Sequence, residues 1–235
     1  MCLNDVDLVT GSRQLAFGFE HRPALSGADF LVTSANRDAV AWLDAWPDWP
    51  APALIIYGPA GSGKSHLGEV FRARAGAREI APDTLGGPGF ADLLNGSGDC
   101  LIDNADAIKD PEALLHLYNA VGSRGGHILM TARHAPAAWQ ITLLDLRSRL
   151  LSAPTVALGR PDDELIKAVL GKLFSDRQVR VDVDVVEYLA RRMERSLTEA
   201  QRLVDAIDRA ALAAHRDVTV PFVREIVQSL RVDKG

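Results

Sequence analysis

The feature that most constrains this chain is a glycine-rich octapeptide between a short apolar run and a helical segment. It reads Gly58-Pro-Ala-Gly-Ser-Gly63-Lys64-Ser65 and follows the apolar run 53–57. Glycines let successive backbone N–H groups turn inward around an anion, and the positive end of the following helix points at the same place. The lysine adds charge for the β- and γ-phosphates, and the hydroxyl can bind Mg²⁺. The pattern predicts a P-loop that holds ADP or ATP with Mg²⁺.

The residues expected to contact the nucleotide form one continuous stretch. They are Gly58, Pro59, Ala60, Gly61, Ser62, Gly63, Lys64, Ser65 and His66. Ser65 is also an expected Mg²⁺ ligand, whereas the His66 side chain is expected to pack along the helix and not to act as an acid or base. The alternative is a glycine-rich turn with a chance lysine. The strand, loop and helix in register argue against it.

A second acidic element follows the apolar run 100–102, which ends in Asp103 and Asn104. A carboxylate at this place can hold the shell of Mg²⁺, although an aspartate after a strand is often only a turn former. Asn104 occupies the position where many P-loop ATPases have a glutamate that polarises the attacking water. Because an amide is no general base at neutral pH, we expect good nucleotide binding and slow unaided hydrolysis.

Apolar runs alternate with helical segments up to residue 159, which predicts an α/β fold with a parallel sheet and helices on both faces. The expected strands are 53–57, 100–102, 127–131 and 153–158. The expected helices of this part are 38–46, 64–73, 111–121 and 144–151. Only helices are expected later, at about 161–174, 184–194, 197–215 and 220–231. We therefore expect a flexible segment at 1–27, a nucleotide-binding domain at 28–159 and a small helical domain at 160–235.

Composition and charge narrow the classes of function. The net charge of −5 and the pI of about 5.7 argue against a protein whose main task is to grip bare nucleic acid. Only Cys2 and Cys100 occur, with no metal-binding spacing, so both are expected to be plain thiols in a reducing compartment. We see no signal peptide and no apolar stretch near the roughly 18 residues of a membrane span. These features predict a cytoplasmic protein without a membrane partner.

Taken together, these residues resemble the AAA+ ATPase module of the DnaA family and, within it, the Hda-type regulators. The similarity covers about residues 29–232. It is carried by Ile-Asp103-Asn104 before a short helix, by the strand end 130–133, which resembles the sensor 1 region, and by the segment 144–150, which resembles the arginine-finger motif. The resemblance implies an AAA+ P-loop NTPase sheet followed by a C-terminal helical lid domain.

The resemblance also implies roles for individual residues. Thr131 belongs to the nucleotide site, and Arg149 stands in the finger position, from which a guanidinium reaches the nucleotide of a neighbouring subunit. Such fingers contribute about 10³–10⁵ in rate. The alternatives are that Arg149 is a surface arginine, or that Arg147 is the finger. In the lid, Thr198 stands where DnaA-type proteins have the sensor 2 arginine, and Arg195 or Arg202 is the candidate to reach the phosphates instead.

Residues 14–19 resemble the short motif with which Hda-type proteins and polymerases bind the β sliding clamp of DNA polymerase III. Gln14 is suited to hydrogen-bond at the rim of a pocket, and Leu15, Phe17 and Phe19 are apolar anchors for a groove. The alternative is that these apolar side chains pack against the protein's own core.

The resemblance thus implies a regulatory inactivator of DnaA. Such a protein binds ADP or ATP, docks on the clamp and reaches DNA only through the clamp. It promotes ATP hydrolysis by DnaA in trans and has weak or no ATPase activity of its own. Whether it self-associates is left open. The lack of a helix-turn-helix domain after Gly235 argues against an origin-binding initiator. A helicase loader or transposon-type AAA+ ATPase is the alternative, and it would hydrolyse ATP rapidly by itself. A small-molecule P-loop kinase would need an acceptor pocket and a lid inserted in the α/β domain.

Overall fold

The computed structural model describes residues 32–90 and 98–232, which divide into two compact units. The sheet unit contains residues 32–166 and the segment Arg195–Thr198. The helical unit contains Lys167–Glu194 and the residues from Glu199 onward. The predicted clamp motif, residues 14–19, and the predicted flexible segment 1–27 lie outside the described residues.

The sheet has five parallel strands in the order β2-β3-β4-β1-β5. They are β1 (Ala53–Tyr57), β2 (Arg78–Glu79), β3 (Cys100–Ile102), β4 (Ile128–Ala132) and β5 (Thr155–Ala157). Strand β1 pairs with β4 on one side and with β5 on the other. Because all strands run the same way, the segments that follow β1, β3 and β4 meet at one edge of the sheet, where ligands of such sheets bind.

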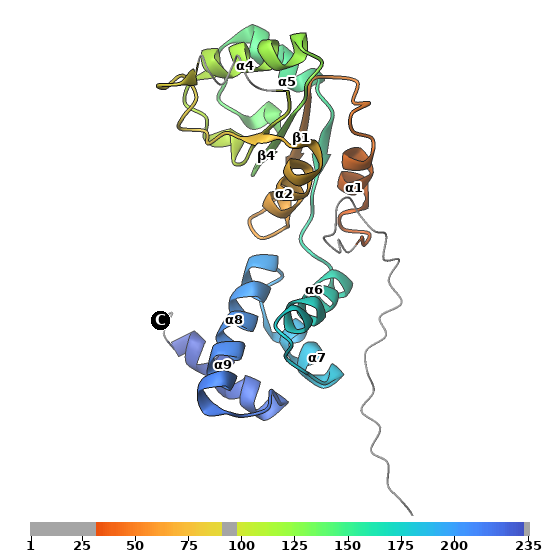
Figure 1. Cartoon of the computed structure of the whole chain (residues 1–235), viewed down its shortest axis with the longest axis vertical. Coiled ribbons are helices and arrows are strands. Elements are labelled where there is room, and N and C mark those ends of the chain that lie inside the picture. The colour runs from red at the N-terminus through yellow and green to blue at the C-terminus, as the bar shows by residue number, and fades with distance from the viewer. Residues whose placement is uncertain (1–31, 91–97, 233–235) are drawn as a thin grey trace, which may run out of the picture. The chain divides into compact units, whose positions relative to one another are not determined.

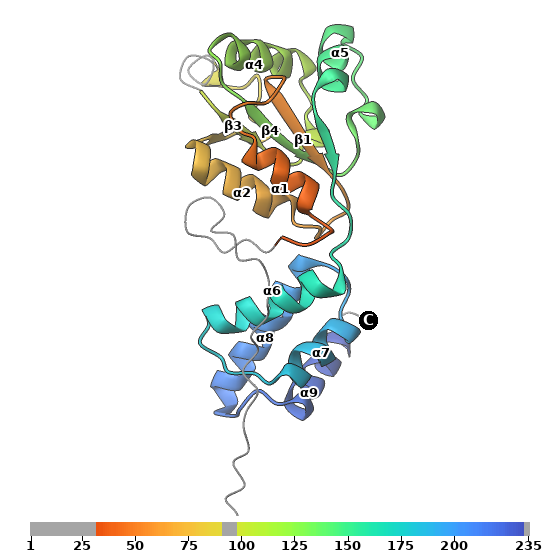
Figure 2. The same cartoon turned by 90° about the vertical axis from the view of Figure 1, so that its right-hand side faces the viewer.

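Two helical layers cover the sheet (Figure 1, Figure 2). On one face lie α1 (Arg37–Asp44) and α2 (Lys64–Ala75), and on the other α4 (Pro111–Ser123) and α5 (Leu144–Ser152). Side chains of β1 alternate between the two: Leu54 packs in the cluster with Phe71 of α2, and Ile55 in the cluster with Leu117 of α4. Burial of each such side chain contributes about 1.5–3 kcal/mol, so the continuous apolar strands hold the sheet between its helices.

Helix α4 shows how local sequence sets an element boundary. Asp110 precedes it, and the Asp110 carboxylate accepts a hydrogen bond from the Ala113 N–H at 2.9 Å. Pro111 occupies the first turn, where its fixed φ suits a helix and its missing N–H costs nothing. The helix therefore begins at the residue that the sequence predicts.

The helical unit is built from the four predicted segments. They form α6 (Asp163–Asp176), α7 (Val183–Arg192), α8 (Leu197–Ala214) and α9 (Val220–Val232), of which α6 and α8 begin in the sheet unit. Its buried side chains include Phe174, Leu189, Ile207 and Val223. Arg177 donates a charged hydrogen bond to Asp205, which joins the end of α6 to α8.

The predicted fold class is confirmed, with small differences in bounds. The predicted strand 127–131 is displaced by one residue, the predicted strand 153–158 is shortened to Thr155–Ala157, and helix ends differ by one or two residues. Strand β2 was not predicted, because Arg78 and Glu79 are both exposed and show no apolar pattern. Within 32–90 and 98–232, every helix is too short or too polar to serve as a membrane span.

Candidate nucleotide-binding site

The loop between β1 and α2 has the backbone geometry that its glycines predict. Gly61 and Gly63 have φ values of 73° and 103°, in the left-handed region that glycine tolerates. A Cβ at Gly58 would lie 2.1 Å from the Leu158 carbonyl oxygen, and one at Gly61 would lie 1.9 Å from the Ser196 Oγ. The loop is therefore packed closely against two other segments of the sheet unit, and a larger residue would displace it.

Helix α2 presents an uncapped N-terminus to the same loop. No side chain in the described part of the protein caps this end, and its first turn contains no acidic residue. The first N–H groups of a helix lack intrahelical partners, and the helix dipole places partial positive charge there. This end of α2 is therefore suited to an anion such as a phosphate.

Two buried polar side chains in the loop also fit phosphate groups. Lys64 is 7% exposed, and its Nζ donates a hydrogen bond to the Pro59 carbonyl oxygen at 2.7 Å. Burial lowers the pKa of the Lys64 ammonium, whereas the nearby Asp103 carboxylate acts to raise that pKa. Ser62 is 3% exposed, and its buried Oγ has no hydrogen-bond partner among the described residues. Buried groups of this kind are stabilised by a polar or charged partner, which phosphate oxygens would supply.

Three segments meet at the carboxylate of Asp103. The Ser65 Oγ donates to Asp103 Oδ2 at 2.9 Å, and the buried Thr131 hydroxyl donates to Asp103 Oδ1. The Asn104 N–H donates in turn to the Thr131 Oγ1 at 3.2 Å. Ser65, Asp103 and Thr131 thus lie together, and a hydroxyl beside a carboxylate is an oxygen pair that suits Mg²⁺.

Asn104 has a conformation that the sequence alone does not reveal. Its φ of 57° and ψ of 47° are in the left-handed region, which asparagine tolerates better than most residues. The amide Nδ2 lies 3.5 Å from Asp103 Oδ2. The residue after the acidic strand is therefore an amide held beside the candidate metal carboxylate.

Asn104→Glu is expected to raise the rate of ATP hydrolysis by this protein alone about 10²-fold, because it supplies the missing general base. The left-handed backbone should cost this variant about 1 kcal/mol of stability. Phosphate release measured with purified protein checks the rate. Asn104→Gln is the matched control, since it carries the same backbone strain without a base. Equal rates for the two variants would contradict the prediction.

Thr131→Val is expected to lower the free energy of unfolding by about 2 kcal/mol. The change preserves shape but removes the acceptor of the part-buried hydrogen bond from the Asn104 N–H and a donor to Asp103. Urea unfolding followed by tryptophan fluorescence measures it, because all four tryptophans belong to the sheet unit. Thr155→Val, at an exposed position of β5, should change the unfolding free energy by less than about 0.5 kcal/mol. If Thr131→Val changes the unfolding free energy as little as Thr155→Val does, the hydrogen bonds of the Thr131 hydroxyl are not important for stability.

Arg149 lies on α5, on the face of the sheet opposite α2. Its Nε donates to Asp145 Oδ1 at 3.0 Å, and its guanidinium carbon lies 5.8 Å from the centre of the Tyr118 ring. The side chain remains 39% exposed. The structure thus places this arginine on a different helix from the P-loop of its own chain.

The two lid arginines differ in their surroundings. Arg195 pairs with Asp163 at 2.9 Å, and both side chains are more than half exposed. Arg202 is held by two hydrogen bonds to Glu199, at 2.9 and 2.7 Å. Arg195 belongs to the sheet unit together with the P-loop, whereas Arg202 belongs to the helical unit. Of the two, Arg195 is therefore the better candidate for a phosphate contact.

Sequence reasoning missed two residues that touch the P-loop. The Leu197 N–H donates to the Gly61 carbonyl oxygen at 2.8 Å, and Ser196 fills the space that a side chain at Gly61 would need. No pattern marks either residue, because the contact joins segments far apart in the chain. The start of α8 thus touches the loop directly, next to Arg195.

Comparison with known proteins places this site in a family context. Residues 162–227 match the model of the Hda lid domain. An uncharacterised protein of Haemophilus influenzae is 27% identical in an alignment of 197 positions that covers 77% of this chain and 83% of that protein. Domain III of the Thermotoga maritima replication initiation protein DnaA superposes with a TM-score of 0.72 at 18% identity, over 85% of this chain and 94% of that one.

A second solved structure carries a nucleotide analogue. The replication initiator DnaA bound to AMPPCP and single-stranded DNA superposes with a TM-score of 0.66 at 16% identity, over 84% of this chain and 70% of that one. At these identities the likeness to the solved structures concerns the fold, and the lid match adds the narrower relationship. The chain therefore has the AAA+ fold of these DnaA structures, and its residues 162–227 are similar to the Hda lid domain.

Proposed function

We propose that this protein is an Hda-like regulatory inactivator of DnaA. It binds ADP or ATP, docks on the β sliding clamp through residues 14–19, and presents Arg149 to ATP-bound DnaA. DnaA then hydrolyses its ATP, which prevents renewed initiation of replication. The observation that carries the proposal is the Hda lid match at 162–227, which follows a DnaA-like AAA+ sheet.

The protein's own nucleotide site serves binding more than hydrolysis in this proposal. Gly58 to Ser65, together with the N-terminus of α2, would hold the phosphates, and Ser65 and Asp103 would hold the shell of Mg²⁺. Bound Mg²⁺ neutralises phosphate charge and makes the nucleotide bind more tightly. Asn104 supplies no base, so the residues of this chain position a nucleotide without promoting attack of water on it.

The surroundings of Arg149 support a role in trans. A guanidinium keeps its charge at any physiological pH, and this one is partly exposed on a helix surface. An exposed pair at i and i+4, such as the one with Asp145, is worth only about 0.3–0.5 kcal/mol. Arg149 can therefore leave Asp145 for the phosphates of a second subunit at little cost.

The test is ATP hydrolysis by DnaA in the presence of clamp loaded on DNA, with and without this protein. The proposal expects acceleration by the wild type, and loss of that acceleration at limiting protein concentration for Gln14→Ala/Leu15→Ala, which removes the clamp anchor. Omitting the clamp should have the same effect as the double variant. If the wild type leaves DnaA unchanged and hydrolyses ATP rapidly by itself, a helicase loader or a transposon-type ATPase replaces this proposal.

A further inference from the structure

The short segment between the end of α7 and the start of α8 carries an arginine next to the P-loop. The Ser196 Oγ would lie 1.9 Å from a Cβ at Gly61, and the Leu197 N–H donates to the Gly61 carbonyl oxygen at 2.8 Å. Leu197 Cδ1 would also lie 3.1 Å from a Cβ at Gly63. Arg195 directly precedes these two residues and belongs to the same sheet unit. Its guanidinium therefore extends from a segment that touches the phosphate-binding loop.

A carboxylate at the start of α6 pairs with this guanidinium. The Arg195 Nη2 lies 2.9 Å from Asp163 Oδ1, and both side chains are more than half exposed. Asp163 follows β5 by a few residues, and in between the Leu158 carbonyl oxygen lies 2.1 Å from the place of a Cβ at Gly58. The P-loop thus packs against both of the segments that carry the ion pair.

The Asp163 carboxylate does not depend on Arg195 for its stabilisation. It lies in the first turn of α6 together with Glu164, where the positive end of the helix dipole favours acidic side chains. It is also largely exposed to water. Because an exposed ion pair contributes little to stability, Arg195 can leave Asp163 at a small cost.

We propose that Asp163 lowers the nucleotide affinity of this protein by competing with the bound phosphates for Arg195. This inference rests on the nucleotide binding in the proposed function and adds a residue that sets its strength. Phosphate oxygens form charge-assisted hydrogen bonds with a guanidinium, so a bound nucleotide can take Arg195 from the carboxylate. The observed affinity is then reduced by the fraction of molecules in which Arg195 is free to make that contact.

The opposite effect would arise if Arg195 bridged both anions. Asp163 would then hold the guanidinium in place and strengthen nucleotide binding. Bridging would keep a carboxylate close to the phosphates, where like charges repel. A carboxylate released into water avoids that repulsion, and the exposure of the pair therefore favours competition.

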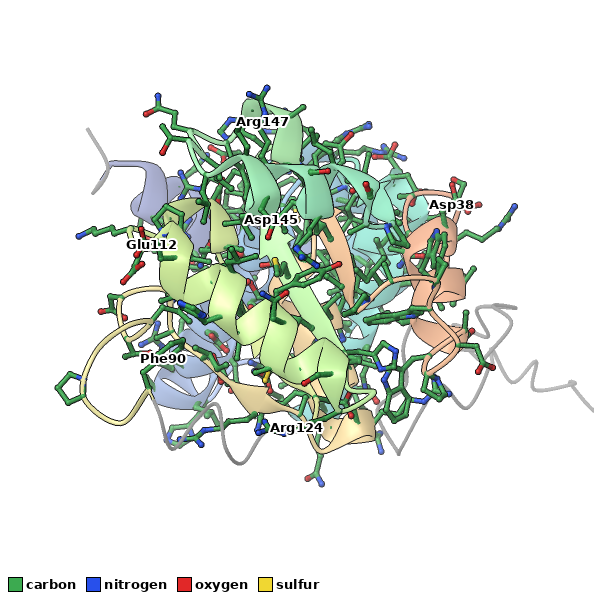
Figure 3. The ribbon with its side chains drawn as sticks, turned by 90° about the horizontal axis from the view of Figure 1, so that it is seen from above. Asp38, Phe90, Glu112, Arg124, Asp145 and Arg147 are labelled. Atoms are coloured by element: carbon green, nitrogen blue, oxygen red, sulfur yellow. The ribbon has the colours of Figure 1, made fainter. Side chains whose placement is uncertain are left out.

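Asp163 and Arg195 are separate from the helix that carries the proposed finger. Arg149 belongs to α5, on which Figure 3 labels Asp145 and Arg147. A substitution at Asp163 therefore leaves the finger and its ion pair intact. Nucleotide binding and stimulation of DnaA can accordingly be measured as two independent properties.

The test is a double-mutant cycle in which isothermal titration calorimetry gives the dissociation constant of AMPPCP with Mg²⁺. AMPPCP carries three phosphates and is not hydrolysed, so it offers every phosphate that Arg195 could contact. Asp163→Asn keeps the shape of the side chain and is expected to tighten binding about 2–5-fold. Arg195→Ala should weaken binding about 10-fold. Adding Asp163→Asn to Arg195→Ala should then change the affinity less than about 1.5-fold.

Glu225→Gln is the matched control. Glu225 pairs with Arg216 at 3.2 Å in the helical unit, and both side chains are more than half exposed, as in the pair of Asp163. The control removes one negative charge, just as Asp163→Asn does, and should bind AMPPCP as the wild type does. Thermal unfolding without nucleotide checks that each variant is folded.

The outcomes separate this inference from the proposed function. If Asp163→Asn does not tighten binding, or tightens it equally in Arg195→Ala or no more than Glu225→Gln does, the inference is wrong and the proposed function is unaffected. If the expected coupling is found but the wild type does not stimulate hydrolysis by DnaA, the inference stands and the proposed function fails. No binding of AMPPCP by the wild type would overturn both.

Discussion

Arg149→Ala is expected to lower the maximal rate of ATP hydrolysis in the complex with DnaA by about 10³-fold, which returns DnaA to its basal rate. A guanidinium that enters a neighbouring site stabilises charge that spreads over the transferred phosphoryl group, and alanine offers nothing in its place. The measurement is a titration of DnaA with this protein, read for the maximal rate of hydrolysis at its plateau.

The loss of Arg149 should leave the fold and the protein's own nucleotide binding unchanged. Its contacts in this chain are an exposed ion pair with Asp145 and a cation–π contact with the Tyr118 ring. Both are weak, about 0.5 kcal/mol each. A drop in hydrolysis by DnaA without a drop in melting temperature or in ADP affinity is therefore the expected combination.

Arg191→Ala is the matched control for this variant. Arg191 lies on α7 and pairs with Glu187 at 2.9 Å, with the same i, i+4 spacing as Arg149 and Asp145. Arg191→Ala, like Arg149→Ala, removes an arginine from an ion pair one helical turn apart, but it does so in the helical unit. Full stimulation by Arg149→Ala would contradict the assignment, and Arg147→Ala would then identify the alternative finger.

The P-loop and the central strands could be predicted because their chemistry leaves few alternatives. An apolar run buried on both faces is continuous, so 53–57 and 100–102 are found at the bounds that β1 and β3 have. The loop sequence needs glycines at the positions where the structure has positive φ. The lysine and the serine are then expected, because the phosphates need a positive charge and Mg²⁺ needs an oxygen ligand. Local sequence is sufficient wherever the neighbouring residues provide the reason for a conformation.

The remaining features depend on contacts between distant segments, and sequence periodicity does not show those. Arg78 and Glu79 form a strand only because they pair with the edge of β3. The contact of Leu197 with Gly61 arises from the way the start of α8 folds back on the loop. By contrast, the ion pair of Arg149 with Asp145 could have been predicted from the sequence, because Asp145 precedes Arg149 by one helical turn.

The candidate site therefore combines strong features for binding with weak ones for hydrolysis. Three features fit an anion: the N-terminus of α2, the buried Lys64, and the buried Ser62 hydroxyl. Within residues 32–90 and 98–232, no side chain caps that helix end and none bonds the Ser62 hydroxyl. The same site has an amide at the position of the expected base. This combination suits a protein that uses bound nucleotide to stabilise a conformation and does not depend on hydrolysing that nucleotide. The consequence is that binding affinity, more than turnover, should respond to changes in the loop.

Lys64→Ala is expected to weaken ADP and ATP binding about 10³-fold. Charge-assisted hydrogen bonds contribute about 1.5–3 kcal/mol each, and a lysine that reaches two phosphates loses both when it is truncated. Titration with a fluorescent ADP analogue measures the dissociation constant. Lys172→Ala on α6, where the lysine is half-buried and pairs with Asp176 at 3.2 Å, is the control and should bind nucleotide as the wild type does.

The stability of Lys64→Ala distinguishes lost binding from a damaged fold. Burial disfavours the charged form of Lys64 and lowers its pKa, so removing the ammonium relieves a cost of folding and should not lower the unfolding free energy without nucleotide. Saturating ADP should raise the melting temperature of the wild type but not that of the variant, because a ligand stabilises only a protein that binds it. Nucleotide-dependent stabilisation retained in Lys64→Ala would contradict the role of Lys64, whereas a destabilised variant without nucleotide would show that Lys64 is needed for the loop itself.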